Sequence, residues 1–131
     1  MHEATIACAI LDHAVRRLSM LSQPAVISAV YLRVGEFRNV DPESLKFAFN
    51  ALRNSYQNLA DCQLIVEIVP AKALCHANGH EYHAVPESLY RCNKCASGIG
   101  HLSTGEELDI TGTTIIYNET TEKDKYARSH H

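Results

Sequence analysis

Two short segments that carry cysteines constrain this chain more than any other feature. The first runs Cys75-His76-Ala77-Asn78-Gly79-His80, and the second is Cys92-Asn93-Lys94-Cys95. Tight turns of this kind, set a short distance apart, are typical of structural zinc ribbons, because each turn directs two side chains at one tetrahedral ion. We therefore expect Cys75, Cys92 and Cys95 to bind one zinc ion.

The identity of the fourth ligand is undecided, because the first segment has Asn78 where the pattern calls for a second cysteine. Asparagine is a poor zinc ligand. Among the nearby histidines we favour His80, with His76 as the alternative. His83, His101 and water are further candidates. A site closed by four protein ligands is structural, whereas catalysis by zinc needs an open position.

Composition bounds the class of protein. The 131 residues suffice for one domain with a small insert, and 46% of them are hydrophobic, as in a globular protein. A net charge of −3 gives no field that would attract nucleic acid or an anionic membrane. The start Met1-His2-Glu3-Ala4 does not resemble a secretory signal. We expect a cytoplasmic protein in which Cys8 and Cys62 are buried thiols.

Hydrophobic periodicity predicts two helices and three strands. Asp41-Pro42 is a strong helix start, because Asp41 can cap the helix and Pro42 suits its first position. In the strand that precedes it, we expect Val26, Val30, Leu32 and Val34 to share one face. The expected elements are a helix over residues 3–21, a strand over 26–34, a helix from 42 to about 56, and strands over 63–69 and 106–117.

The order of these elements predicts an α+β fold, a small domain of two helices and a three-stranded sheet with an inserted zinc-ribbon-like knuckle domain. We place the discontinuous helix and sheet domain at residues 1–70 and 106–120, and the zinc-binding insert at 71–105. Residues 121–131 are expected to form a loose tail. The insert is poor in long apolar runs, so a metal ion is the natural means of holding it together.

The N-terminus is a second candidate metal site. The α-amine of Met1, the amide nitrogens of His2 and Glu3, and the imidazole of His2 can all be offered to one ion. Nitrogen ligands arranged in a plane suit nickel(II) or copper(II). A histidine at the second position is often accidental, so these residues alone leave the site open.

Two further features stay without a firm role. Glu36 lies between a strand and a helix, where it either orients a ligand or is a solvated loop carboxylate. His130 and His131 can bind metal adventitiously, but a terminal pair of this kind is typical of a tail.

Several segments share their order and spacing with one known family, over nearly the whole chain from Met1 to about Tyr117. They are Met1-His2-Glu3, Val34-Gly35-Glu36, Val40-Asp41-Pro42-Glu43-Ser44-Leu45-Lys46-Phe47-Ala48-Phe49, Ile68-Val69-Pro70-Ala71 and the two cysteine segments. In these segments the chain resembles the HypA/HybF family, the nickel incorporation proteins of [NiFe]-hydrogenase maturation.

The resemblance implies a metallochaperone and not an enzyme. Such a protein would bind Ni(II) at its N-terminus, carry a structural Zn(II) site, and deliver nickel to a [NiFe]-hydrogenase large-subunit precursor. The implied partner is a GTPase accessory protein of HypB type, with no role for nucleic acid or a membrane. A sheet whose last strand returns after an insert also leaves a homodimer by strand exchange open.

Site residues are implied position by position. His2 is the implied nickel ligand, with the Met1 amine and backbone amides, and Glu3 stands where the family places a residue that tunes the site. The three cysteines occupy family zinc-ligand positions. Asn78 departs from the family pattern, and His80 follows closely enough to replace the missing ligand.

Two other classes of function compete with metal delivery. One is a zinc-ribbon protein-interaction module that never carries nickel. The other is a small hydrolytic zinc enzyme that uses an open coordination position, with Glu81 or Glu87 as the base. A redox role for Cys92 and Cys95 is disfavoured, because no strand-to-helix context surrounds the pair.

Overall fold

The computed structural model describes residues 2–117 and the backbone of residues 127–130. The chain divides into two compact units. We call Met1–Leu32, Val40–Val66 and Ile110–His131 the helix and sheet unit, and Arg33–Asn39 with Glu67–Asp109 the knuckle unit. The knuckle unit therefore extends beyond residues 71–105, where the sequence places the insert, and takes in a separate segment at residues 33–39.

The helices α1 (Glu3–Ser19) and α2 (Pro42–Leu52) pack against each other in the helix and sheet unit. Helical spacing brings Ile6, Ile10 and Ala14 onto one buried face of α1. Asp41 caps α2, because its Oδ1 accepts the N–H of Glu43 at 3.1 Å. The buried residues of α2 are Leu45 and Phe49. A 3-10 turn, η2 (Arg53–Ser55), follows directly, so the α-helix ends earlier than residue 56.

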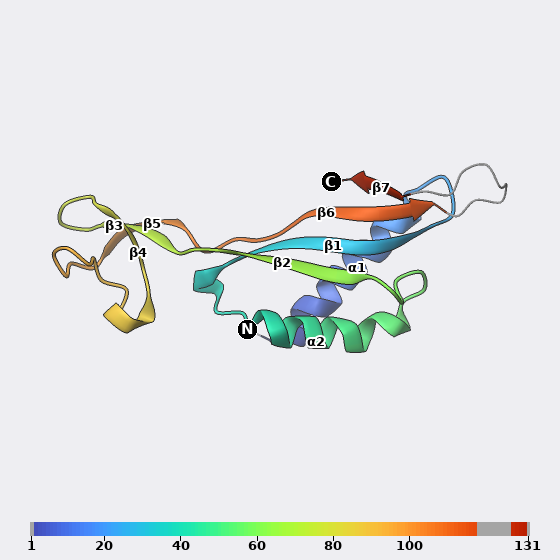
Figure 1. Cartoon of the computed structure of the whole chain (residues 1–131), viewed down its shortest axis with the longest axis horizontal. Helices are drawn as coiled ribbons and strands as arrows, with labels where there is room; N and C mark the ends of the chain where they lie inside the picture. Colours follow the sequence, from blue (N-terminus) through green and yellow to red (C-terminus); the bar gives the residue numbers. More distant parts are fainter. Residues whose placement is uncertain (1, 118–126, 131) are drawn as a thin grey trace. The chain divides into compact units, whose positions relative to one another are not determined.

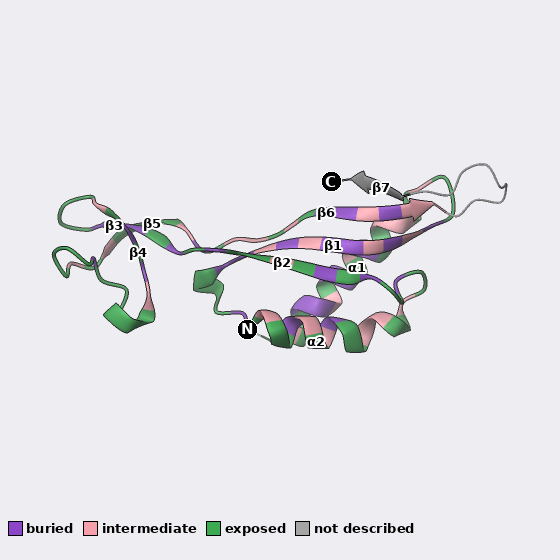
Figure 2. Cartoon of the chain, in the orientation of Figure 1, coloured by how far each residue is buried: buried purple, intermediate pink, exposed green. Residues whose placement is uncertain are grey.

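Four strands form one sheet in the order β2-β1-β6-β7. They are β1 (Ala25–Gly35), β2 (Gln63–Val69), β6 (Leu108–Tyr117) and β7 (Ala127–His130). Figure 1 shows α1 running behind these strands, and Figure 2 shows buried residues along both the strands and the helices. The sequence predicts three strands. The fourth, β7, forms within residues assigned to the tail and pairs antiparallel with β6.

Burial along β1 departs from the expected alternation. Val30, Leu32 and Val34 are buried, as expected for one face. Val26 is only half-buried, and Ile27 is buried in its place. Ala29 and Val30 are both buried, so the inward face changes parity between them. The prediction for Val26 is therefore wrong, because a single alternating pattern does not hold over the whole strand.

The knuckle unit contains a second sheet, in the order β4-β3-β5. Its antiparallel strands are β3 (Lys72–Cys75), β4 (Glu81–His83) and β5 (Ile99–Thr104), and two 3-10 turns, η1 (Glu36–Arg38) and η3 (Pro86–Ser88), flank them. The sequence does not predict these strands. A small buried cluster lies at this sheet, made of Ala71, Ala73, Cys75, Tyr82, Ala84 and Cys92.

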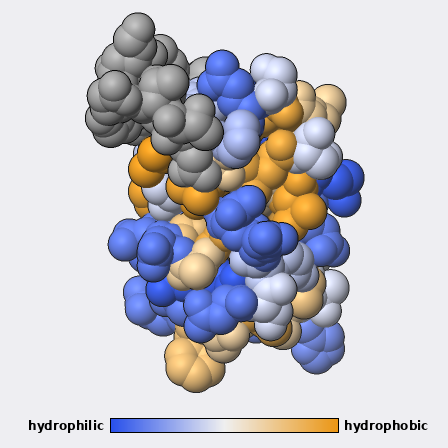
Figure 3. Space-filling view, turned by 90° about the vertical axis from the view of Figure 1, so that its right-hand side faces the viewer, coloured by the Kyte–Doolittle hydropathy of each residue, from blue (hydrophilic) through white to orange (hydrophobic). Residues whose placement is uncertain are grey.

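The predicted α+β class is confirmed: two α-helices accompany the two sheets. No helix among the described residues is long and apolar enough to cross a membrane. One face of the molecule shows apolar side chains between hydrophilic ones (Figure 3). Large apolar side chains such as Met20 and Phe47 are exposed. Such exposure is normal for proteins, so we base no docking site on it.

A close backbone approach in the knuckle unit requires glycine at position 35. The N–H of Gly35 donates to the carbonyl of Glu107 at 2.7 Å, and the N–H of Phe37 donates to the carbonyl of Gly105 at 2.7 Å. A Cβ atom added to Gly35 would lie 2.0 Å from the carbonyl carbon of Gly105. Only a residue without a side chain lets the two backbones come this close.

We expect Gly35→Ala to destabilise the protein by at least about 2 kcal/mol, because backbone and not a flexible side chain must move to accept the methyl group. Gly98→Ala is the matched control, since a Cβ added there would meet no atom within 4 Å. Urea unfolding of both variants, loaded with zinc and followed by circular dichroism, measures the difference. Equal stability of the two variants would contradict this account.

Candidate metal centre

Three cysteine thiols meet in the knuckle unit. Cys75 is the last residue of β3, and Cys92 and Cys95 lie in the turn between η3 and β5. Their Sγ atoms all lie within 4.8 Å of one another. The Sγ atoms of Cys75 and Cys95 are 3.1 Å apart. Sulfur atoms this close can share one tetrahedral metal ion, and the donor set of three thiols fits zinc.

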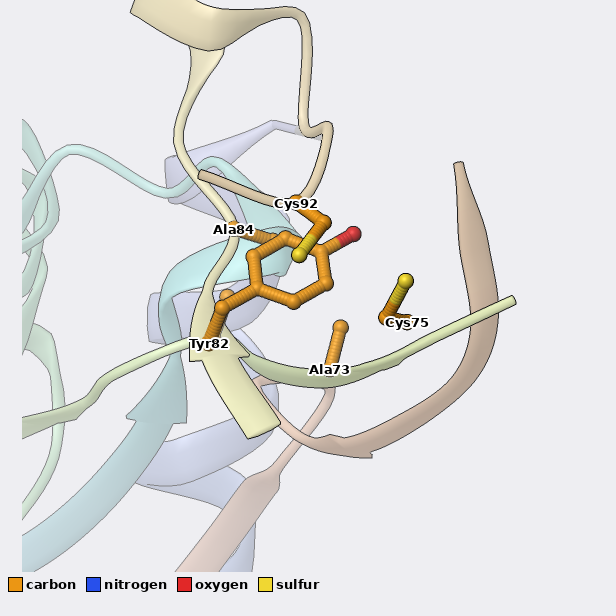
Figure 4. Packing of buried hydrophobic residues seen from close by; sticks show 6 residues of the cluster. Ala73, Cys75, Tyr82, Ala84 and Cys92 are labelled. Carbon is orange, nitrogen blue, oxygen red and sulfur yellow. The ribbon is translucent and has the colours of Figure 1, made fainter. Parts of the chain in front are cut away.

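The packing around Tyr82 holds two of these thiols. Cys75 and Cys92 are buried beside the Tyr82 ring, with Ala73 next to them (Figure 4). The Tyr82 hydroxyl donates to the carbonyl of Tyr90 at 2.7 Å. Burial raises the pKa of Tyr82, and the charges of the nearby cysteines raise it further. The phenol therefore stays protonated and keeps its hydrogen bond to the chain.

Cys95 is the exposed member of the group. Hydrogen bonding from the Ser97 side chain, followed by that from the Cys75 thiol and from the Ser97 backbone, lowers the pKa of Cys95 to about 6. The N–H of Lys94 also donates to the Sγ of Cys92 at 3.4 Å. Donors of this kind favour the thiolate, which is the form that binds metal.

The histidines are placed differently. Among the described residues, no histidine or carboxylate joins the three thiols within the same distance. His80 is half-buried, and its backbone carbonyl accepts the N–H of Cys75 at 2.7 Å. His76 is exposed, and its N–H donates to the carbonyl of Gly98 at 2.9 Å. The structure therefore brings together the three predicted cysteines but not His80 or His76.

Glu36 has a partner within the knuckle unit. Its Oε1 accepts the N–H of Ala71 at 2.9 Å and lies 2.7 Å from Nε2 of His83. The Ala71 N–H first, and then His83, lower the pKa of Glu36. The Glu36 carboxylate therefore links η1 to the start of β3 and to β4 within the chain, and its role toward a ligand stays a prediction.

At the other candidate site, His2 is exposed and precedes α1 in an extended conformation, with φ −86° and ψ 119°. Glu3 is the first residue of α1 and is half-buried. Its Oε2 accepts the N–H of Asp41, the cap of α2, at 3.2 Å. Glu3 therefore connects the starts of the two helices. Met1, the third predicted member, lies outside the described residues.

Comparison with known families identifies the family of the chain. The family model described as "Hydrogenase/urease nickel incorporation, metallochaperone, hypA" matches residues 1–115, which is most of the chain. The chain belongs to the HypA family. The resemblance seen in the sequence is confirmed, and membership in a family of metallochaperones confirms that the chain is not an enzyme.

Relatives in this family match over nearly their whole length. The hydrogenase maturation factor HypA of Synechococcus sp. (strain JA-2-3B'a(2-13)) is 35% identical over 121 residues, 91% of this chain and 89% of that protein. The HypA of Desulfosudis oleivorans is 34% identical over 115 residues, 88% and 98% of the two chains. The solution structure of the Ni metallochaperone HypA from Helicobacter pylori shares the fold, with a TM-score of 0.58 at 19% identity over 86% and 96%.

Two residues that support the candidate metal centre were not predicted from the sequence. Hydrogen bonds from Ser97 stabilise the Cys95 thiolate. Tyr82 packs with Cys75 and Cys92 in one buried cluster. A serine two positions after a knuckle cysteine is a signal that could have been read, because short polar residues often donate to nearby acceptors. The pairing of His83 with Glu36 has no such local signal, since the two residues lie far apart in the sequence.

We expect iodoacetamide to alkylate Cys95 at least about 100-fold faster than Cys62 in the metal-free protein at pH 7, because the thiolate is the reactive form. Cys95 has a pKa of about 6, whereas burial raises the pKa of Cys62 to about 11. Timed labelling with mass spectrometry measures both rates.

Ser97→Ala is the control for this experiment. Removing the largest cause of the lowered pKa should move the pH midpoint of Cys95 labelling upward and leave Cys62 unchanged. Zinc loading should protect Cys95. Equal rates for the two thiols, or a Cys95 rate that zinc does not change, would be inconsistent with the metal centre described above.

Proposed function

We propose that the chain is a nickel metallochaperone that binds Ni(II) through Met1, His2 and Glu3 and delivers it to a [NiFe]-hydrogenase precursor. Membership in the HypA family supports the cargo. The position of His2 supports nickel binding at the N-terminus, because His2 is exposed, extended and just outside the first turn of α1. A histidine placed there can reach an ion without any change to the helix.

The start of α1 offers nitrogen ligands that the fold does not use. The first N–H groups of an α-helix have no acceptor within the helix. The amide nitrogens of His2 and Glu3 could therefore coordinate Ni(II) together with the His2 imidazole, each amide releasing its proton to solvent as the metal binds. Nitrogen donors in a plane are the arrangement that Ni(II) prefers.

Electrostatics make the proposed site suitable for release. The positive end of the α1 macrodipole disfavours a cation. The carboxylates of Glu3 and Asp41 lie at the two helix starts and offset part of that effect. Glu3 is also held by the Asp41 N–H, so it acts on the ion from a fixed position. A carrier must bind its cargo and still release it. The carboxylates favour binding of the cation, and the helix macrodipole favours its release.

The cysteine group has a different role in this proposal. We assign Cys75, Cys92 and Cys95 to Zn(II), because thiolates at this spacing suit a structural site. The ion would hold the turn after β3 to the turn before β5. Delivery of nickel would take place with a GTPase of HypB type and the hydrogenase precursor as partners.

A groove in the knuckle unit favours a second candidate function, a protein-interaction module. Phe37 and Tyr90 form an edge-to-face aromatic pair with ring centroids 5.2 Å apart. Both line the groove, together with the carboxylates of Glu36 and Glu87 and with no lysine or arginine among the lining residues. Such a groove suits a protein segment with a basic residue beside an apolar one. It is compatible with nickel delivery, since a carrier also has to dock.

We expect His2→Ala to weaken Ni(II) binding at least tenfold in isothermal titration of the zinc-loaded protein, equivalent to about 1.4 kcal/mol. Wild-type affinity should also fall at acid pH, because protons compete with the metal ion for nitrogen ligands. Alanine at His130 and His131 in every variant removes adventitious binding.

His13→Ala is the matched control, because it removes a histidine from the same helix. It should leave nickel affinity unchanged. If His2→Ala binds nickel as the wild type does, the N-terminal site is wrong. If neither protein binds nickel, the interaction module becomes the better account.

A further inference from the structure

The two cysteine turns have the same backbone geometry. The N–H of Cys75 donates to the carbonyl of His80 at 2.7 Å, and the N–H of Cys92 donates to the carbonyl of Ser97 at 2.8 Å. Each pair spans five positions, so the two turns can be aligned residue by residue.

A second hydrogen bond fixes this alignment. The N–H of Gly79 donates to the carbonyl of Cys75 at 2.9 Å, and the N–H of Ala96 donates to that of Cys92 at 2.8 Å. Gly79 and Ala96 both have a positive φ, +73° and +62°. The first turn is therefore a complete metal knuckle in its backbone.

Residue 78 occupies the position of Cys95 in this alignment. In the second turn that position supplies a thiolate to the group. In the first turn it carries Asn78, which is exposed. An amide oxygen is a hard, neutral ligand and competes poorly with sulfur or imidazole for zinc. The two turns thus have the backbone of a four-ligand site, but the chain provides a strong ligand at only three of the four ligand positions.

The neighbouring histidines occupy other positions of the turn. His80 aligns with Ser97, which supports the turn through its backbone carbonyl and does not supply a ligand to the group. His76 aligns with Asn93, and its N–H is bonded to the carbonyl of Gly98. In the described part of the chain neither imidazole lies with the three thiols.

We infer that the fourth ligand of the metal ion in the knuckle unit comes from outside the chain, as a water molecule that an external thiolate or imidazole replaces. Cys95 and Asn78 are both exposed, so an incoming ligand reaches this corner from solvent. Three thiolates and Zn(II) carry a net charge of −1. Exchange of water for imidazole keeps that charge, and exchange for a thiolate makes it −2.

This inference rests on the metal site proposed for the three cysteines and is independent of nickel at the N-terminus. Its test therefore uses the cysteine site alone. Cobalt(II) is the probe, because Zn(II) is d10 and has no ligand-field spectrum. The full chain is reduced, freed of metal and loaded with one equivalent of Co(II). Imidazole is then added in one arm and 2-mercaptoethanol in the other.

We expect each ligand to shift the visible Co(II) band of the wild type saturably, with one ligand bound per metal. Asn78→Cys should show no shift and should bind zinc at least about tenfold more tightly in chelator competition, since changes outside the ligand shell alone have effects of this size. Asn78→His is the second variant if Asn78→Cys does not fold. His13→Ala, in α1, is the control for loss of a histidine outside the knuckle unit.

Three results would overturn the inference. In the first, the wild-type band is indifferent to both ligands. In the second, His80→Ala or His76→Ala changes the Co(II) spectrum before any ligand is added, which would make that histidine the fourth ligand. In the third, the wild type fails to bind Co(II) while Asn78→Cys binds it.

Discussion

Three thiol groups lie within 4.8 Å of one another in the knuckle unit, and thiolates this close repel one another unless a cation lies between them. Cys75 and Cys92 are also two of the six residues in the buried cluster of this unit. The other members are three alanines and Tyr82, so the cluster contains only one large side chain. A cation at the thiols would remove the repulsion and would join the turns on either side of this small core. In the proposed function, the packing of Tyr82 and of the three short strands depends on that interaction.

The proposed division of labour follows from the chemistry of the two sites. Thiolates hold zinc strongly, and two of the three cysteines are buried, so the cysteine group suits an ion that stays with the protein. The start of α1 offers an exposed imidazole and backbone nitrogens at the positive end of a helix, which suits an ion that must leave. The two sites lie in different units of the chain, so each can be altered without removing ligands from the other.

Much of the helix and sheet unit could be predicted because its signals are local. Asp41 and Pro42 mark the start of α2, and β2 has the bounds 63–69 that the pattern predicts. The strands β3, β4 and β5 were missed because they are short and are stabilised by pairing with partners distant in sequence. The change of parity at Ala29 in β1 was missed for a related reason, since it depends on what packs against each end of the strand.

The metal centre shows the same limit. Spacing alone identified Cys75, Cys92 and Cys95, because knuckle turns are local structures. Proximity in sequence also suggested His80, which stays a prediction, whereas the backbone hydrogen bonds of the two turns align residue 78 with Cys95. The contact between Glu36 and His83 could not be predicted from a local pattern, because the two residues lie far apart in the sequence.

In the proposed function, nickel and zinc occupy separate sites with different donor atoms. X-ray absorption at the nickel and zinc edges, on the protein loaded with one equivalent of each metal, tests it most directly. The account predicts nickel with nitrogen and oxygen neighbours only, and zinc with sulfur neighbours from the three cysteines. Sulfur in the shell around nickel would contradict it, because the cargo would then lie in the cysteine group.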